Sequence, residues 1–559
     1  MQFLSSVLLS AAALVVGVSH AQSYQDGQRP EIGDSQIDWS TNCTSLSAAS
    51  ALPLKCASFQ VPLDYVNQDV DNTLALTLVR VDAVKEPVLG SIMFNPGGPG
   101  GSGIQYVIGR AQEMLTLTGG QFNLIGFDPR GVNFTLPFTC YNSSSERSAQ
   151  APPYTRGNSS DVALGHNFVS AGVSSQHCLR ASSDRIGLIS TAYVARDMIR
   201  IVDALDEDGL LRFWGVSYGT ILGATVSAMF PERVDRVVLD SNVNAQQYYT
   251  GFDADSNADL DSTLQGFFSG CIQNPSRCAL AGNGTTIESL AESIDSLLGN
   301  LRQTPWATVS DTSVSFLTYT TVKGYIFDRL YSPSRWPTMA RGLQGLLDGN
   351  VTAFRETMTS GTATTTPDAI YGIRCGETSM RHDSFEDLRP LLQQVDELSG
   401  WGGFDFGTIN PIRCSRWLAQ AHEVYRGDWQ VQTNSPILIV GNSHDPVTPF
   451  RSAQNNSETF VGSVLLRHDG YGHGAGAQPS LCTAEAIREY FLHGTLPKAG
   501  TVCKPDVPLF STDTWRDAYE PLSLTDTIAS LGKRDENEKR ALLTAMLGLT
   551  ESGHVYENY

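Results

Sequence analysis

The stretch RFWGVSYG, residues 212–219, says most about the fold of this chain. Its first five residues are mostly apolar and indicate a buried strand, and the small-residue segment 220–230 behind them indicates a helix. A Gly-x-Ser-x-Gly sequence between a strand and a helix predicts a nucleophile elbow, in which the glycines relieve crowding around a sharp turn. The alternative is a serine in an ordinary turn. We expect Ser217 to stand at the end of the strand, with the helix N-terminus presenting amides to negative charge.

Two later loops could supply the partners of such a serine. A serine hydroxyl needs a base to become nucleophilic, and the base needs an acid that orients it. Asp445 follows the apolar run 436–440, and His473 lies in the glycine-rich loop GYGHG, residues 470–474. The chain order Ser, Asp, His is that of the α/β-hydrolases. We therefore predict Asp445 as the acid and His473 as the base.

Other residues near these loops compete for the same roles. His444 and His468 are alternative bases, and Asp469 is an alternative acid. A histidine directly after strand residues is more often structural, whereas His473 has flexible glycines on both sides. We therefore favour His473.

The stretch NPGGPGGSG, residues 95–103, follows an expected strand and is suited to an oxyanion hole. Such a hole needs two backbone N–H groups aimed at one point. We expect one from Tyr218, the residue after the nucleophile. The other should come from Gly98, which precedes a proline in a turn where the backbone must approach the substrate. A phosphate-binding loop is the rival interpretation, but the stretch lacks the Gly-Lys-Ser/Thr ending and the Rossmann spacing.

Short apolar runs alternate with helical segments along much of the chain, which predicts an α/β protein with a mostly parallel sheet. In such sheets the chemistry lies on loops at the carboxyl ends of strands. The fold class that we predict is the α/β-hydrolase fold. The runs expected to form strands are 59–63, 74–81, 91–94, 122–127, 212–216, 234–239, 437–440 and 463–466.

The interval 245–430 differs from the rest, because it carries helical patterns and little strand alternation. We interpret it as a helical cap insertion, since expected strands of the sheet lie beyond it; an independent domain is the alternative. The hydrolase core then comprises residues 22–244 and 431–530. Residues 531–559 contain a charged run with two dibasic pairs, and we expect a flexible tail there.

Residues 1–21 have the pattern of a signal peptide, with an apolar run and small residues before the expected cleavage site at Gln22. A membrane anchor is the alternative, but the run is short for a spanning helix and no basic flank follows it. We expect a secreted protein that does not contact the membrane once the signal is removed.

The cysteines and glycosylation sequons agree with secretion. Ten cysteines lie in the mature part without a CxxC spacing, so disulfides are expected rather than a metal cluster. Sequence cannot fix their connectivity, but pairing between neighbours is the simplest: Cys43–Cys56, Cys140–Cys178, Cys271–Cys278, Cys375–Cys414 and Cys482–Cys503. The sequons that predict N-glycosylation are Asn42, Asn133, Asn142, Asn158, Asn283, Asn350 and Asn455.

The charge balance excludes one class of function. The chain has 38 Lys and Arg against 58 Asp and Glu, a formal net charge of −20, and no basic cluster offsets it. Such a field repels phosphate backbones, so a nucleic-acid partner is not expected.

The segments 95–103, 128–131, 237–240 and 369–377, together with Ser217 and the two later loops, resemble the secreted tripeptidyl-aminopeptidase-type α/β-hydrolases, relatives of the prolyl aminopeptidases. The resemblance runs from about Cys56 to Cys503, and its last part resembles the TAP-like C-terminal segment of that family. It implies an exopeptidase that cleaves short peptides from free N-termini, with Ser217, Asp445 and His473 as triad.

An aminopeptidase must also hold an ammonium group, which a partly buried carboxylate does well. Glu377 occupies an acidic position in a motif of these relatives, and we predict it as substrate-binding; a surface glutamate near a disulfide is the alternative. The expected substrate is a peptide or a small acyl compound, and two-step acyl transfer needs no metal or organic cofactor.

Three other functions remain open. An esterase or lactonase can use the same triad. A serine carboxypeptidase would have Glu before the nucleophile, where this chain has Val216. A binding protein without activity is disfavoured, because all three residue types of a triad follow expected strands.

Overall fold

The computed structural model describes residues 36–43, 46, 50–67, 72–309, 314–358, 368–511, 524–533 and 535–550. The predicted signal peptide, residues 1–21, lies outside the described residues. These described residues form one compact unit.

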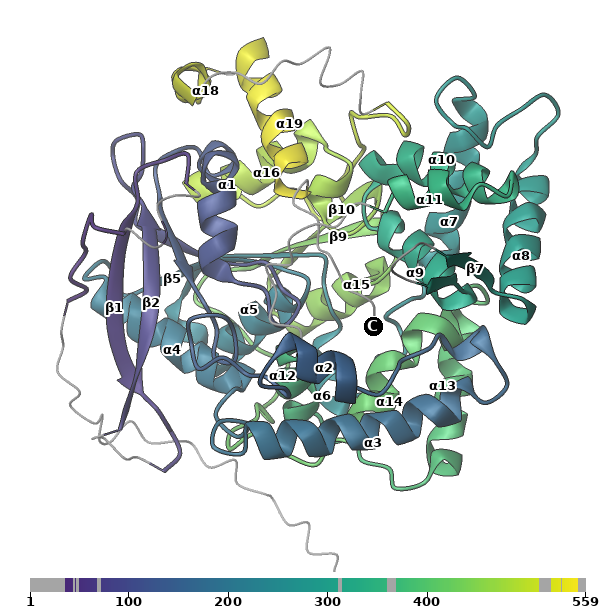
Figure 1. Ribbon diagram of the computed structural model, residues 1–559. Helices are drawn as coiled ribbons and strands as arrows, with labels where there is room; N and C mark the ends of the chain where they lie inside the picture. Colours follow the sequence, from purple (N-terminus) through teal and green to yellow (C-terminus); the bar gives the residue numbers. More distant parts are fainter. Residues whose placement is uncertain are drawn as a thin grey trace, which may run out of the picture. The chain divides into compact units, whose positions relative to one another are not determined.

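A nine-stranded sheet runs through the described part of this unit, with the strand order β1-β2-β4-β3-β5-β6-β9-β10-β11 (Figure 1). β1 and β2 pair antiparallel, as do β2 and β4, and the remaining pairs are parallel. The predicted mostly parallel α/β sheet is confirmed. The strands are β1 (Lys55–Pro62), β2 (Thr73–Val81), β3 (Ser91–Asn95), β4 (Asn123–Phe127), β5 (Leu211–Val216), β6 (Val234–Asp240), β9 (Leu438–His444), β10 (Val464–Tyr471) and β11 (Val502–Cys503).

Helices cover both faces of the sheet, because its central strands are apolar on both sides. The helices α1 (Gly103–Leu117) and α16 (Leu481–His493) share one apolar cluster with one face. The helices α4 (Thr191–Ala204) and α5 (Tyr218–Met229) share a second cluster with the other face. The carboxyl ends of β5, β9 and β10 therefore meet at one edge between the two layers, which is where the site lies.

The interval between β6 and β9 is mainly helical, and most of its buried apolar residues form one cluster around Phe267, Ile294 and Trp336, which Phe510 joins from beyond the interval. It also contains a hairpin, β7 (Trp306–Val309) with β8 (Val314–Leu317), which was not predicted. Its helices are α6 (Ala245–Thr250), α7 (Leu260–Gln273), α8 (Ile287–Gln303), α9 (Tyr319–Leu330), α10 (Trp336–Leu347), α11 (Val351–Glu356), α12 (Ala369–Glu377), α13 (Phe385–Leu398), η5 (Gly403–Gly407) and α14 (Ile409–Ser415).

The boundary between core and cap differs from the predicted one. Helix α3 (Ala163–Ala181) falls within residues 22–244, yet Phe168 and Ala171 pack with Leu388 and Ile412 of the cap. The excursion between β4 and α4 is therefore part of the cap, because its apolar face has its partners there.

The expectation of a flexible tail from residue 531 is wrong for residues 536–550. These form helix α19 (Glu536–Thr550), which lies against α1 and α16. Met546 is 0% exposed within the apolar cluster of that face. The carboxylate of Glu538 forms a buried ion pair with Arg488 at 2.6 Å. Apolar burial and this pair order the segment.

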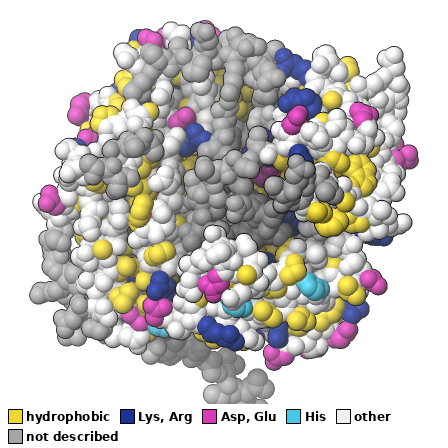
Figure 2. Space-filling view, in the orientation of Figure 1, with side chains coloured by type: hydrophobic (Ala, Val, Ile, Leu, Met, Phe, Trp, Pro, Cys, Tyr) yellow, Lys and Arg dark blue, Asp and Glu magenta, His cyan; other side chains and the backbone are white. Residues whose placement is uncertain are grey.

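The structure contains five disulfides, in the predicted pairing. None of the described helices is long and apolar enough to cross a membrane. On the face shown in Figure 2, basic and acidic side chains are interspersed rather than gathered into one large patch.

Candidate active site

Ser217 stands between β5 and α5 with φ 58° and ψ −125°, so a sharp turn holds it there as predicted. The elbow leaves no room for a side chain at either flanking glycine. A Cβ on Gly215 would lie 2.1 Å from the carbonyl oxygen of Gly219, and a Cβ on Gly219 would lie 2.5 Å from the carbonyl oxygen of Asn95. Real Cβ atoms do not approach so closely. The Gly-x-Ser-x-Gly pattern is thus explained by the packing of the elbow.

The glycine-rich loop lies directly against the elbow. A Cβ on Gly97 would lie 2.8 Å from the Cβ of Ser217, and Gly98 lines the same cavity as Ser217. Tyr218 is the first residue of α5, whose first N–H groups have no partner within the helix. The two predicted oxyanion-hole residues, Gly98 and Tyr218, therefore lie beside the nucleophile.

Asp445 and His473 are in hydrogen-bond contact. His473 Nδ1 lies 3.0 Å from Asp445 Oδ2, and both side chains are buried. Asp445 also accepts from the backbone N–H groups of Val447 (3.0 Å) and Thr448 (2.9 Å), which fix the orientation of the carboxylate. Thr448 Oγ1 contacts Asp445 and His473, and Thr448 lines the cavity that contains Ser217.

In the described part of the chain, no hydrogen bond joins Ser217 Oγ to His473. Catalytic hydrogen bonds are often long in free enzymes and tighten when the substrate binds. The backbone of His473 is tied to the cap, because its N–H donates to the carbonyl of Tyr331 at 2.8 Å. The Tyr331 ring meets the His473 ring edge-on at 5.1 Å.

Sequence reasoning missed Asn442, a buried residue of β9. Its Nδ2 donates to the carbonyl oxygens of Gly472 (2.9 Å) and Gly474 (2.8 Å), the two neighbours of His473. An amide that holds both sides of a loop sets the position of the residue between them. The asparagine three residues before Asp445 was the only sequence signal for this role.

The alternative residues have other roles. His468 is fully buried between Thr483 Oγ1 and the carbonyl of Gln478, and burial lowers its pKa to about 4. His444 stacks on Tyr471 at 4.4 Å between ring centres. Asp469 lies at the surface and pairs with Arg467.

The cavity in front of Ser217 is walled on its outer side by the cap. It holds about 1100 Å³ of space not filled by atoms, counting the part open to solvent. Core residues on its wall include Gly98 and Thr448, and the residues of α9, α12 and α14 form the opposite side. Its charged wall residues are Arg156, Asp253, Asp328 and Arg374.

The structure corrects the prediction for Glu377. This residue ends helix α12, but its side chain is 0% exposed and does not line the cavity; Arg374, one turn earlier, does. The side chain of Arg374 forms an ion pair with Asp253, and both residues line the cavity. Glu377 has its carboxyl group inside the protein because the helix turns that face toward the core, away from the cavity lining.

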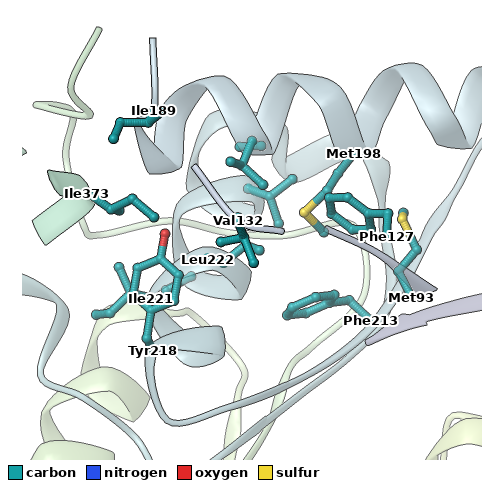
Figure 3. Packing of buried hydrophobic residues seen from close by; sticks show 14 of the residues in the cluster. Met93, Phe127, Val132, Ile189, Met198, Phe213, Tyr218, Ile221, Leu222 and Ile373 are labelled. Atoms are coloured by element: carbon teal, nitrogen blue, oxygen red, sulfur yellow. The ribbon is translucent and has the colours of Figure 1, made fainter. Parts of the chain in front are cut away.

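The Glu377 carboxyl group is linked to the elbow. Its Oε1 accepts from Thr191 Oγ1 at 2.8 Å, and Thr191 Oγ1 lies 2.6 Å from the hydroxyl of Tyr218. Burial raises the pKa of Glu377 to about 8, so the neutral form prevails at pH 7. Figure 3 shows Tyr218 of α5 in the same apolar cluster as Ile189 and Ile373. The cap helix α12 thus contacts the residue after the nucleophile.

A second cavity lies beside His473. It holds about 590 Å³, counting the part open to solvent, and is therefore about half the size of the first. His473, Val216 and Asp240 line it on the core side, Arg335 on the cap side, and Leu549 of α19 closes it further. Tyr331 lines both cavities and separates them.

Two family models match this chain. Residues 90–343 match the model described as alpha/beta hydrolase fold, and residues 405–503 match the model described as TAP-like protein. With the sheet and the elbow, these matches show an α/β-hydrolase fold with the site of a serine hydrolase. The C-terminal part of the chain is similar to the TAP-like segment.

Relatives of known name are similar over most of their length. Serine protease Hip1 of Mycobacterium tuberculosis (strain ATCC 25618 / H37Rv) is 27% identical over 493 residues, which cover 85% of this chain and 92% of Hip1. Carboxylesterase B of the same strain is 28% identical over 538 residues, covering 90% and 98%. Tripeptidyl aminopeptidase of Streptomyces lividans is 24% identical over 485 residues, covering 84% and 87%.

Proposed function

We propose that this chain is a secreted serine exopeptidase that releases short peptides or single residues from free N-termini. The observation that carries the proposal is the cavity in front of Ser217, because a cavity covered on one side by a cap admits a chain end more readily than the middle of a long chain. Relatives named serine protease and tripeptidyl aminopeptidase support peptide chemistry.

The proposed mechanism is two-step acyl transfer. Ser217 attacks the carbonyl carbon as His473 removes the serine proton, and Asp445 fixes the imidazole tautomer and stabilises its charged form. The N–H groups of Tyr218 and Gly98 bind the oxyanion. His473 then protonates the leaving amine, and a water molecule activated by His473 releases the acyl group.

The two cavities suggest how a substrate lies. His473 must reach the leaving amine, and it lines the smaller cavity, so we assign that cavity to the leaving group. The larger cavity shares its wall with Ser217 and Gly98, and we assign it to the acyl part.

The second candidate function is hydrolysis of a small ester, which the relative named Carboxylesterase B favours. The test uses two chromogenic peptides that differ only in acetylation of the N-terminus, with a simple acyl ester alongside. Cleavage of the free peptide alone supports the exopeptidase. Cleavage of the ester with both peptides intact overturns it in favour of the esterase.

A further inference from the structure

Arg156 places a buried positive charge in the wall of the larger cavity. It lies between α2 (Ser144–Gln150) and α3, and it is 7% exposed. The chain brings it there because the excursion between β4 and α4 packs against the cap. It is one of two arginines on this wall.

The guanidinium of Arg156 is held by packing more than by hydrogen bonds. It lies over the Phe406 ring at 4.4 Å, and a Cβ on Gly324 would be 3.1 Å from its Nη2. Nη1 makes one long contact, 3.5 Å, with the backbone oxygen of Asp405. Nε is buried and has no hydrogen-bond partner among the described residues. Aromatic stacking fixes the group while most of its donors remain available.

The carboxylates around the cavity have other cations or donors as direct partners, and Asp405 acts on the charge of Arg156 only from a distance. The carboxylate of Asp405 accepts from Tyr319 at 2.6 Å and lies 3.6 Å from Lys323. Asp253 is paired with Arg374. In the described part of the chain, no carboxylate lies within 4.0 Å of the Arg156 guanidinium.

The last carboxylate of the wall, Asp328, also has its own partners. It is shared by Arg329 and Arg335, so that cluster already has more positive than negative charge. Among the charged side chains of the wall, Arg156 is thus the one with no oppositely charged group within 4.0 Å in the described part of the chain.

An unpaired buried charge is costly unless a partner arrives. Burial already lowers the pKa of Arg156. A carboxylate that enters the cavity would find a planar, preoriented group with free donors, which is the geometry of a bidentate arginine–carboxylate pair.

We propose that Arg156 binds a carboxylate in the acyl part of the substrate, so that the preferred peptides carry Asp or Glu in the segment that is released. This inference rests on the proposed function. It narrows the substrate class to acidic peptides and assigns Arg156 as a specificity-determining residue.

The test is a set of peptides with free N-termini in which Glu or its isostere Gln occupies each position of the released segment in turn. At one position the wild type should cleave the Glu peptide about tenfold better than the Gln peptide in kcat/KM, the magnitude of one charge-assisted pair. Arg156→Gln should bring this ratio to about one, and Arg156→Lys should restore part of it. Arg341→Gln, an exposed arginine of α10, is the matched control and should keep the wild-type ratio.

Two results would overturn the inference. One is a wild type that cleaves Glu and Gln peptides equally at every position; this result needs no variant and is independent of folding. The other is an Arg156→Gln protein that retains the preference. In both cases, cleavage of the peptides still supports the exopeptidase, whereas failure to cleave any peptide, with the ester hydrolysed, refutes the proposed function itself.

Discussion

At the scale of single residues, Ser217 shows how a site imposes strain on the backbone. Its φ of 58° lies in the left-handed region, which non-glycine residues avoid at a cost of about 1–3 kcal/mol. Three contacts hold it there: its N–H donates to the Asp240 carbonyl, and its own carbonyl accepts from the N–H and hydroxyl of Thr220. The strain presents the hydroxyl to the cavity.

We expect both Ser217→Ala and Ser217→Gly to abolish turnover, because each lacks the nucleophile. The glycine variant should be the more stable of the two by about 1 kcal/mol, since glycine adopts positive φ without strain. Hydrolysis assays and chemical denaturation of the matched pair measure both effects. Activity near wild type in either variant would contradict the assignment of Ser217.

The buried carboxyl group of Glu377 should make the free energy of unfolding depend on pH. Its pKa is raised from 4.5 to about 8, so the folded protein binds this proton more tightly than the unfolded chain. The stability that the neutral carboxyl provides is complete below about pH 4.5 and is lost as the pH rises toward about pH 8. Glu377→Gln removes the titration and keeps the shape.

The difference in melting temperature between Glu377→Gln and the wild type should therefore grow in favour of the variant as the pH rises from about 5 to about 8. Glu386→Gln, at an exposed glutamate of α13, is the control and should show no such trend. Parallel curves for wild type and Glu377→Gln would disprove the buried neutral carboxyl.

The sequence was informative about the residues of the site that lie on loops after strands. Ser217, Asp445 and His473 could be proposed from the sequence because each has a local pattern of its own. Glu377 was misplaced, because a motif gives the position of a residue on a helix but not the face that the helix turns to the cavity. Arg156 has no motif, and only the packing of distant segments brings it to the wall.

At the scale of elements, helix α19 adds a third helix to the face covered by α1 and α16. Its apolar residues Leu542, Ala545 and Met546 are all buried there. Because charged and apolar residues are mixed in this segment, the sequence did not reveal an amphipathic helix there. The helix forms because its apolar face packs on an apolar surface of the core.

We expect Met546→Ala to lower the free energy of unfolding by about 2–5 kcal/mol, the usual cost of removing a large buried side chain. Asn537→Ala, at an exposed position of the same helix, should change it by less than about 0.5 kcal/mol. Denaturant titration of both variants measures the difference. Equal, small effects would mean that the helix contributes nothing to the fold.

The strands were easier to predict than the helices of the cap. The inner strands are short apolar runs with little ambiguity, whereas the cap is formed from segments far apart in sequence. Helix α3 could not be assigned to the cap from sequence, because its apolar partners Leu388 and Ile412 lie more than two hundred residues later. The hairpin of β7 and β8 was missed because its strands are only four residues each.

At the scale of the whole molecule, the structure separates the sequons by accessibility. Asn283 and Asn350 are exposed. Asn158 is half-buried, and its backbone N–H and Nδ2 donate to the carboxylate of the buried Asp405 at 2.8 and 3.5 Å. A glycan on Nδ2 of Asn158 would disturb that contact.

We expect the folded protein, secreted from a eukaryotic host, to carry glycans on Asn283 and Asn350 but not on Asn158. Mass spectrometry of peptides after enzymatic deglycosylation measures the occupancy of each sequon. The same spectra test the predicted N-terminus at Gln22. A fully occupied Asn158 would contradict the contact with Asp405.

The five disulfides have an order that bears on how the chain is made. Each bond joins a cysteine to the next cysteine along the chain, so no pair encloses or overlaps another. Suppose that the chain enters an oxidising compartment N-terminus first and that each pair is oxidised as soon as its second cysteine arrives. No third reduced cysteine is then present with which either partner could form a non-native disulfide. Timing alone can then select the native pairing, and a disulfide isomerase would have little to correct.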